Sequence, residues 1–228
     1  MPVSTEMHCH VLPGIDDGAK DVATSLTLIK GLQQLGIKKI IATPHIIGDT
    51  HPNTPATISA ALQKTKDACA KENINVDLSA AAEYMLDDNF ILLLKNKEKL
   101  LTLDGNYILT EQSYATPTQN LPAILFELIT NGYKPLLAHP ERYVYYHNSY
   151  KAYHQLADMG FLLQVNMLSL TGYYGFSVAR AAKYILQNNL TSFIGSDIHH
   201  VRHLQTLQQT KTLQLLHKYC SSRLFNHF

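Results

Sequence analysis

Cysteine is scarce in this sequence, tryptophan is absent, and no long apolar run occurs. The three cysteines, Cys9, Cys69 and Cys220, are scattered and odd in number, which indicates free thiols in a reducing compartment rather than a disulfide framework. No apolar stretch reaches the roughly 18 residues that a membrane span needs. The N-terminus also lacks a basic segment followed by an apolar one, so we expect no signal peptide. The expected protein is cytoplasmic and does not span a membrane.

Neither sign of charge is in excess, because 19 Lys and Arg residues face 18 Asp and Glu residues among 228. This balance argues against nucleic acid or an anionic membrane surface as the main partner. Histidine is frequent in comparison, with twelve residues. Where these histidines lie along the chain is more informative than their number.

Short apolar runs alternate with longer segments of helical periodicity, an order that predicts an α/β fold with a parallel sheet. The expected strands cover residues 38–45, 76–83, 106–111, 134–139, 161–166 and 191–197, with 8–10 as a first strand. The expected helices include 22–35, 57–72, 121–131, 177–188 and an amphipathic C-terminal helix over 203–219. This last helix either packs on the rest of the fold or contacts a partner. No linker divides the sequence, so we expect residues 1–228 to form a single domain.

Most of the expected strands end in a residue that can bind a metal or act in catalysis. These strand-end residues are His45, Glu83, Glu111, His139 and Asp197. In a βα barrel the C-terminal ends of the strands meet on one rim, so such side chains would gather there. A single polar residue at a strand end is commonplace, but a whole set of ligand types is not.

Two histidines near the N-terminus, His8 and His10, are separated by one residue. In an extended segment their side chains lie on one face and Cys9 lies on the other, so the pair can chelate one divalent ion. Two surface histidines are the alternative. Asp17 follows in a glycine-rich turn, where aspartate is also an ordinary turn former.

The candidate ligands outnumber the needs of one ion and suggest a cluster of two or three. They are His8, His10, Asp17, His45, Glu83, Glu111, His139, Asp197 and His199. Mixed imidazole and carboxylate ligands suit zinc, manganese or iron, and no set of thiolates is present that would indicate structural zinc. Closely spaced ions generate hydroxide near neutral pH and clamp the oxygens of a phosphoryl group, which predicts a phosphoesterase.

Two arginines follow these ligands. Arg142 comes three residues after His139, and its planar guanidinium is suited to phosphate, although a surface salt bridge is the alternative. Arg202 offers a second basic group. Four tyrosines either line the rim or are packing residues: Tyr84, Tyr143, Tyr173 and Tyr174.

Five segments, taken in order, resemble those of the PHP (polymerase and histidinol phosphatase) superfamily. They are "HCHVLPGIDDGAKD", "ATPHI", "AAEYMLDD", "LAHPERY" and "GSDIHH". More narrowly, the chain resembles the manganese-dependent bacterial protein-tyrosine phosphatases of capsule and exopolysaccharide loci, the CpsB/YwqE type. This resemblance implies a distorted (β/α)7 barrel with a three-metal site at the C-terminal ends of its strands. Manganese is the expected metal, with iron, zinc and magnesium as alternatives.

The resemblance also implies roles for individual residues. A first metal would bind His8, His10, Glu83 and Asp197, a second Glu83, Glu111 and His139, and a third Asp17, His45 and His199. Arg142 would bind the phosphate. Arg202 lies near the place of a second arginine, at a spacing that differs from the family pattern, and Gln112 replaces an apolar residue.

The substrate implied by the resemblance is phosphotyrosine on a protein, specifically a membrane-associated tyrosine kinase of polysaccharide export. A small-molecule phosphatase of the histidinol-phosphate type is the alternative within the same superfamily. A non-catalytic metal-binding regulator is a third hypothesis, but it predicts lost ligands, and every expected ligand is present. A nuclease would need a basic channel, which the charge balance disfavours.

Overall fold

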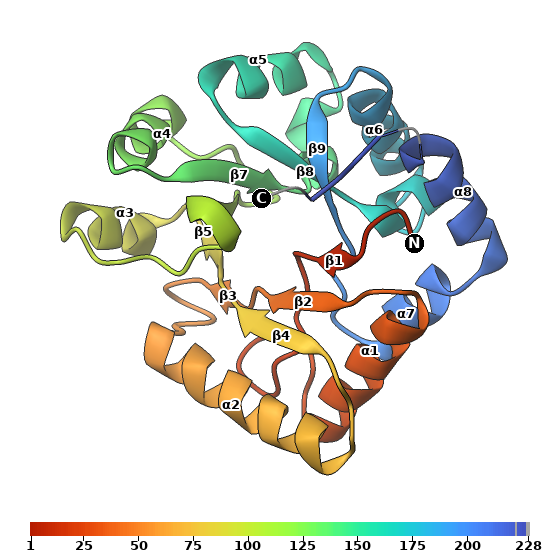
Figure 1. Cartoon of the computed structure of the whole chain (residues 1–228). Coiled ribbons are helices and arrows are strands. Elements are labelled where there is room, and N and C mark those ends of the chain that lie inside the picture. Colours follow the sequence, from red (N-terminus) through yellow and green to blue (C-terminus); the bar gives the residue numbers. More distant parts are fainter. Residues whose placement is uncertain (222, 227–228) are drawn as a thin grey trace.

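Helices surround a ring of parallel strands in the computed structural model, which describes residues 1–221 and 223–226 (Figure 1). The strands are β1 Thr5–Glu6, β2 Lys39–Ala42, β3 His45–Ile46, β4 Asp77–Ala80, β5 Glu83–Met85, β6 Tyr107–Glu111, β7 Lys134–Ala138, β8 Leu162–Asn166 and β9 Thr191–Gly195. The helices are α1 Val22–Gln34, α2 Pro55–Lys71, α3 Asp88–Lys95, α4 Leu121–Thr130, α5 Lys151–Met159, α6 Phe176–Gln187, α7 Val201–Leu207 and α8 Thr210–Cys220. Within the described part of the chain, none of these helices combines the length and apolarity needed to cross a bilayer.

The strands form two sheets, in the orders β1-β2-β4 and β3-β5-β6-β7-β8-β9, and every paired strand runs parallel to its neighbour. Because β3 continues β2 and β5 continues β4, the nine described strands occupy seven positions. The ring closes where the Asp197 N–H donates to the His8 carbonyl (2.8 Å) and the His10 N–H donates to the Ile198 carbonyl (2.9 Å). This is the distorted (β/α)7 barrel that we expected.

Three predicted strands differ from the structure. The first strand is Thr5–Glu6, and residues 8–10 continue from it with one isolated bridge, between Cys9 and Ile198. The predicted strand 38–45 is divided where Pro44, which has no N–H, interrupts the hydrogen-bond ladder. Strand 76–83 is divided at the same level, between β4 and β5.

The predicted C-terminal helix over 203–219 is two helices, α7 and α8. The chain turns at Gln209, whose backbone is extended (φ −65°, ψ 135°). Leu204, Leu207 and Leu216 are nevertheless all buried, so the apolar spacing runs on across the break. That continuity explains why the sequence pattern predicts one helix.

Local capping explains where the first helices begin. The Asp21 side chain accepts the Thr24 N–H at the start of α1. Thr54 and Thr57 exchange side-chain and backbone hydrogen bonds at the start of α2, with Pro55 in the first turn. These caps fix where each helix leaves the barrel rim.

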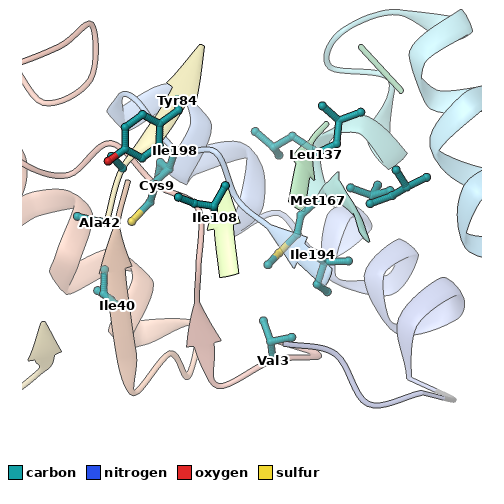
Figure 2. Packing of buried hydrophobic residues seen from close by; sticks show 14 of the residues in the cluster. Val3, Cys9, Ile40, Ala42, Tyr84, Ile108, Leu137, Met167, Ile194 and Ile198 are labelled. Carbon is teal, nitrogen blue, oxygen red and sulfur yellow. The ribbon is translucent and has the colours of Figure 1, made fainter. Parts of the chain in front are cut away.

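Alternation along the strands separates two hydrophobic layers. Ile108, Leu137 and Ile194 belong to the larger cluster (Figure 2). This cluster also includes residues of the surrounding helices. Their strand neighbours Leu109 and Leu136 belong to a smaller cluster, and Leu109 shares its strand face with Glu111. We infer that the smaller cluster fills the barrel interior beneath the strand-end residues.

Gly195, the last residue of β9, allows close packing against the histidine segment. A Cβ atom at this position would lie 2.6 Å from the His8 Cβ and 3.2 Å from the Gln164 Nε2. We expect Gly195→Ala to lower the free energy of unfolding by about 1–3 kcal/mol, as overpacking does, and to weaken metal binding by displacing His8. Urea denaturation and metal titration measure the two effects.

Gly172→Ala is the control, because its backbone is left-handed (φ 84°) but no atom lies within 4 Å of the added carbon. It should change stability only, without changing metal affinity. Unaltered stability and metal affinity in Gly195→Ala would contradict the packing described here.

Candidate metal centre

The nine predicted ligand residues lie together at one end of the barrel. Three groups offer ligand atoms that all lie within 4.8 Å of one another. The groups are His8, His10, Glu83 and Asp197; His45, Glu83 and Glu111; and His10, Asp17, His45 and His199. Shared members join the three groups into one continuous cluster.

Glu83 lies at the centre of this cluster and is fully buried. Its Oε2 is 3.1 Å from His8 Nε2, 3.3 Å from His10 Nε2 and 3.3 Å from His45 Nδ1. Its Oε1 is 3.1 Å from His139 Nε2. The two histidines separated by Cys9 therefore do point to the same place, while Cys9 packs into the hydrophobic core (Figure 2).

His45 faces two of the groups. Its Nδ1 lies 2.9 Å from Glu111 Oε1, and its Nε2 lies 3.5 Å from Asp17 Oδ1. His199 Nε2 is 3.4 Å from the same Asp17 oxygen, whereas His139 Nε2 is 3.9 Å from Glu111 Oε2. The resemblance groups Glu111 with His139. In the structure Glu111 lies closer to His45 than to His139.

The two carboxylate oxygens of Asp197 face different neighbours. Oδ1 lies 3.3 Å from His8 Nε2 and 3.4 Å from His10 Nε2. Oδ2 accepts hydrogen bonds from Arg142 Nη1 and Asn166 Nδ2, both at 2.7 Å. One carboxylate therefore links the histidine pair to an arginine.

Backbone strain accompanies two of these residues. Asp197 has a φ of 52° and His139 a φ of 35°, in the left-handed region that few residues other than glycine adopt. His139 also precedes Pro140, which disfavours a helical backbone further. Strain of this kind persists where the surrounding structure enforces it, and it clusters at functional sites.

Polar side chains behind the ligands orient the imidazoles. His8 Nδ1 lies 2.8 Å from Gln164 Oε1, and His10 Nδ1 lies 2.8 Å from Asp16 Oδ2, so the Nε2 atom of each ring is directed at the cluster. Asp16 also accepts the His45 N–H (3.2 Å). The only sequence signals for these partners are a glutamine within the apolar strand "FLLQVN" and a second aspartate beside Asp17.

The donor set fits a metal cluster. Several of its atoms are buried and, although they lie close to one another, make no hydrogen bond of good geometry among the described residues: His8 Nε2, His10 Nε2, His45 Nδ1, Glu83 Oε2 and Glu111 Oε1. Buried polar atoms are normally satisfied, and divalent ions would satisfy these. Imidazole with carboxylate is a donor set for zinc, manganese or iron.

Charges within the cluster compensate one another. Burial alone would raise the pKa of Glu83 and of Asp197, but the nearby imidazoles hold both pKa values well below their usual range. Burial alone would likewise lower the pKa of His8, but Glu83 and Asp197 raise it to about 9. In the metal-free protein, protons on histidine therefore balance the buried carboxylates.

A pocket of about 410 Å³ opens over the cluster, and Arg142 is part of its wall. The Arg142 guanidinium carbon lies 4.8 Å from the ring centre of Tyr114 and 4.4 Å from that of Tyr174, so an aromatic ring contacts it on two sides. Burial opposes its charge, but Asp197 raises its pKa, so Arg142 stays cationic. Tyr114, which the sequence pattern does not single out, also lines this pocket.

Arg202 is not among the residues that line the pocket. It is exposed on α7, with its guanidinium carbon 5.8 Å from the ring centre of Tyr173. His203, the next residue, lines the pocket instead and is buried. Burial and the neighbouring His200 lower the pKa of His203 to about 4, so this imidazole is neutral near neutral pH.

Of the four tyrosines considered for the rim, Tyr174 lines the pocket, Tyr173 packs edge-on against His203 without lining the pocket, and two are buried packing residues. Tyr84 is buried, and its hydroxyl accepts the Leu101 N–H (2.8 Å). Tyr143 is also buried, and its hydroxyl donates to the Ala138 carbonyl (3.0 Å). The packing alternative therefore holds for Tyr84 and Tyr143.

Residues 4–225 match the family described as "Capsular polysaccharide synthesis, CpsB/CapC". The chain belongs to this family. The tyrosine-protein phosphatase YwqE of Bacillus subtilis (strain 168) is 29% identical over 219 residues, which cover 96% of this chain and 86% of YwqE. The family predicted from the sequence motifs is thus confirmed.

Solved structures agree with the family assignment. One match comes from crystal structures of YwqE from Bacillus subtilis and CpsB from Streptococcus pneumoniae, which are described as metal-dependent tyrosine phosphatases. It has a TM-score of 0.84 at 30% identity and covers 96% of this chain and 88% of that chain. The histidinol phosphate phosphatase of Lactococcus lactis subsp. lactis matches with a TM-score of 0.60 at 10% identity, covering 98% and 94% of the two chains. The second match shows a shared fold only.

Metal binding should release protons, because His8 is protonated in the metal-free site below pH 9 and must be neutral to bind a metal. Apparent metal affinity should therefore rise with pH up to about 9. The same proton stabilises the metal-free fold fully below about pH 6.5, and this contribution is lost as pH rises through 9. Calorimetry at pH 7 in two buffers of different ionisation enthalpy measures the release, and a binding heat independent of buffer would contradict it.

Asp16→Ala should weaken metal binding by roughly 10- to 100-fold, because His10 loses the carboxylate that orients its ring. Asp16→Asn keeps an oxygen acceptor and should lose less. Metal titration followed by competition with a chelator measures both variants. Asp49→Asn, an exposed aspartate, is the control, and equal affinities in all four proteins would argue against an orienting role for Asp16.

Proposed function

We propose that this chain is a metal-dependent protein-tyrosine phosphatase that hydrolyses phosphotyrosine on a partner protein. The observation that carries the proposal is that eight of the nine candidate ligands form three overlapping groups of potential metal-binding atoms, with His139 next to Glu83, below a pocket whose wall includes the half-buried Arg142. Membership of the CpsB/CapC family and the named activity of YwqE support it. A regulator that has lost its chemistry would not be expected to retain all of these side chains.

The proposed cofactor is a cluster of two or three divalent ions, with manganese as the first candidate. His8, His10, Glu83 and Asp197 would hold one ion. Glu111 and His139 would hold another with Glu83, and Asp17, His45 and His199 would hold the third. When bound, such ions supply Lewis acidity and an activated water for attack at phosphorus.

Arg142 is the proposed phosphate-binding residue. Asp197 fixes one of its terminal nitrogens, and the rings of Tyr114 and Tyr174 restrict its plane. The remaining N–H groups are left to donate to phosphate oxygens in a set orientation. Positioning of this kind lowers the barrier, because the guanidinium need not be ordered during the reaction.

Tyr114 is the proposed contact for the substrate's phenyl ring. It is 41% exposed at the pocket, and its ring lies 5.7 Å from the ring of His139, in a stacked orientation. The exposed part of this ring, beside the proposed phosphate-binding arginine, can contact the phenyl ring of a phosphotyrosine side chain. An open pocket of about 410 Å³ can admit a side chain that is still attached to a polypeptide.

The proposed partner is a membrane-associated tyrosine kinase of polysaccharide export, encountered in the cytoplasm. The description of the family as one of capsular polysaccharide synthesis supports this choice. We further propose that residues 1–228 act as one phosphatase domain, since the ligands come from strands spread over most of the chain.

The test is phosphate release from a phosphotyrosine peptide and from histidinol phosphate, measured side by side. Each substrate is assayed with manganese, with chelator and with the His139→Ala variant. We expect metal-dependent turnover of the peptide, reduced at least 100-fold in the variant, since a misplaced group at the reacting centre costs about this much.

A preference for histidinol phosphate would reject a protein as the substrate in favour of a small molecule. The proposed metal chemistry would be unaffected. Turnover of neither substrate by a metal-loaded protein would reject the phosphatase proposal. Peptide turnover that persists in the presence of chelator would reject the metal requirement.

A further inference from the structure

The pocket wall formed by α7 contains a histidine that the metal cluster does not use. α7 begins at Val201, and its exposed face includes Val201 and Arg202, whereas His203 and Leu204 are buried. His203 therefore lines the same pocket as Arg142, while Arg202 does not. The helix turns the histidine inward and the neighbouring arginine outward.

Hydrogen bonding fixes which nitrogen of His203 carries the proton. The His199 backbone N–H donates to His203 Nδ1 (3.2 Å), so Nδ1 must be unprotonated and the proton lies on Nε2. The ring is also packed in place. The His200 ring lies 3.9 Å from it, and the Tyr173 ring meets it edge-on at 5.1 Å.

The Nε2 atom has no hydrogen-bond partner among the described residues. It is also absent from the fully buried polar atoms that lack a partner, so it retains some exposed surface. Since His203 is only 7% exposed and lines the pocket, we take the exposed part of its side chain, Nε2 included, to face the pocket. A fixed neutral imidazole thus presents an N–H donor to whatever the pocket binds.

Tyr174 is a neighbour of both this donor and Arg142. Its ring centre is 4.4 Å from the Arg142 guanidinium carbon and 6.1 Å from the centre of the His203 ring. Both donors therefore flank the same tyrosine of the pocket wall. Oxygens of one phosphate group can accept from two such donors at the same time.

We propose that the Nε2–H of His203 is the second protein donor to the phosphate group bound by Arg142. The proposal rests on the function proposed above, in that the ligand is a phosphate monoester. Its partner atom is a non-bridging phosphate oxygen rather than the oxygen of the leaving phenol.

Two substitutions separate the donor from the packing role of the ring. His203→Asn places an amide oxygen near the position of Nδ1, so it retains the acceptor for the His199 N–H but removes the donor. His203→Gln places an amide nitrogen near the position of Nε2 and retains a donor. His217→Asn, an exposed histidine on α8, is the matched control.

The measurements are calorimetric binding of inorganic phosphate to the manganese-loaded full chain, and KM and kcat for phosphotyrosine peptide and p-nitrophenyl phosphate. We expect His203→Asn to weaken phosphate binding by roughly 10- to 100-fold, as expected for a lost hydrogen bond to a charged group. His203→Gln should recover most of this loss, and both aryl substrates should be affected equally. Manganese content and melting temperature should stay the same in each variant.

Three outcomes would overturn the proposal. Wild-type phosphate affinity in His203→Asn would remove the donor role. Equal losses in His203→Asn and His203→Gln would assign the histidine a packing role. A loss of kcat that is larger for phosphotyrosine than for p-nitrophenyl phosphate, with phosphate affinity unchanged, would place the donor on the leaving oxygen.

Phosphate binding is measured without turnover, so this test is independent of the substrate. If no substrate is hydrolysed but phosphate binding still depends on His203, the function proposal fails and the donor assignment stands. If the peptide is hydrolysed and phosphate binding is insensitive to His203, the function proposal stands and the donor assignment fails.

Discussion

A buried carboxylate, Glu83, imposes the main constraint on this fold. It is fully buried and contacts four imidazoles, which come from the N-terminal segment, from the start of β3 and from the residue after β7. A buried anion is costly unless it is paired and hydrogen-bonded, so these segments must meet at one level of the barrel. The closed parallel ring provides that meeting point, because it places all of its strand ends on one rim.

The same constraint explains the irregular parts of the barrel. β2 and β4 are interrupted just before His45 and Glu83, and each resumes in the other sheet. The chain leaves its strand at His139 and again at Asp197 with a left-handed backbone. These distortions lie at the ends that carry the candidate ligands. Within the strands the pairing stays parallel, with one register shift between Leu163 and Gln164 of β8. The left-handed backbone at His139 and Asp197 thus occurs where the candidate ligand side chains come together.

Much of this arrangement could be predicted from the sequence, because strand ends and side-chain alternation follow simple periodicities. The ligand residues at strand ends and the shared direction of His8 and His10 are of this kind. The inward turn of His203 and the outward turn of Arg202 are not, since they depend on how α7 packs. The orienting role of Gln164 depends on the register between distant strands, which one sequence does not encode locally. Aspartate is so common in turns that Asp16 carries no distinctive signal.

Asp197 contacts two parts of the site, the histidine pair His8 and His10 and the arginine Arg142. Its Oδ1 faces His8 and His10, while its Oδ2 fixes Arg142 and accepts from Asn166. Any change in the charge at the histidine side alters the field felt by the guanidinium, since both act on one carboxylate. Free energies of binding are reciprocal, so if an anion bound at Arg142 changes the affinity for a cation at the histidine side by some factor, the cation changes the affinity for the anion by the same factor. The proposed phosphate contact and the candidate metal ligands are therefore linked through one carboxylate, because Arg142, His8 and His10 all lie against Asp197.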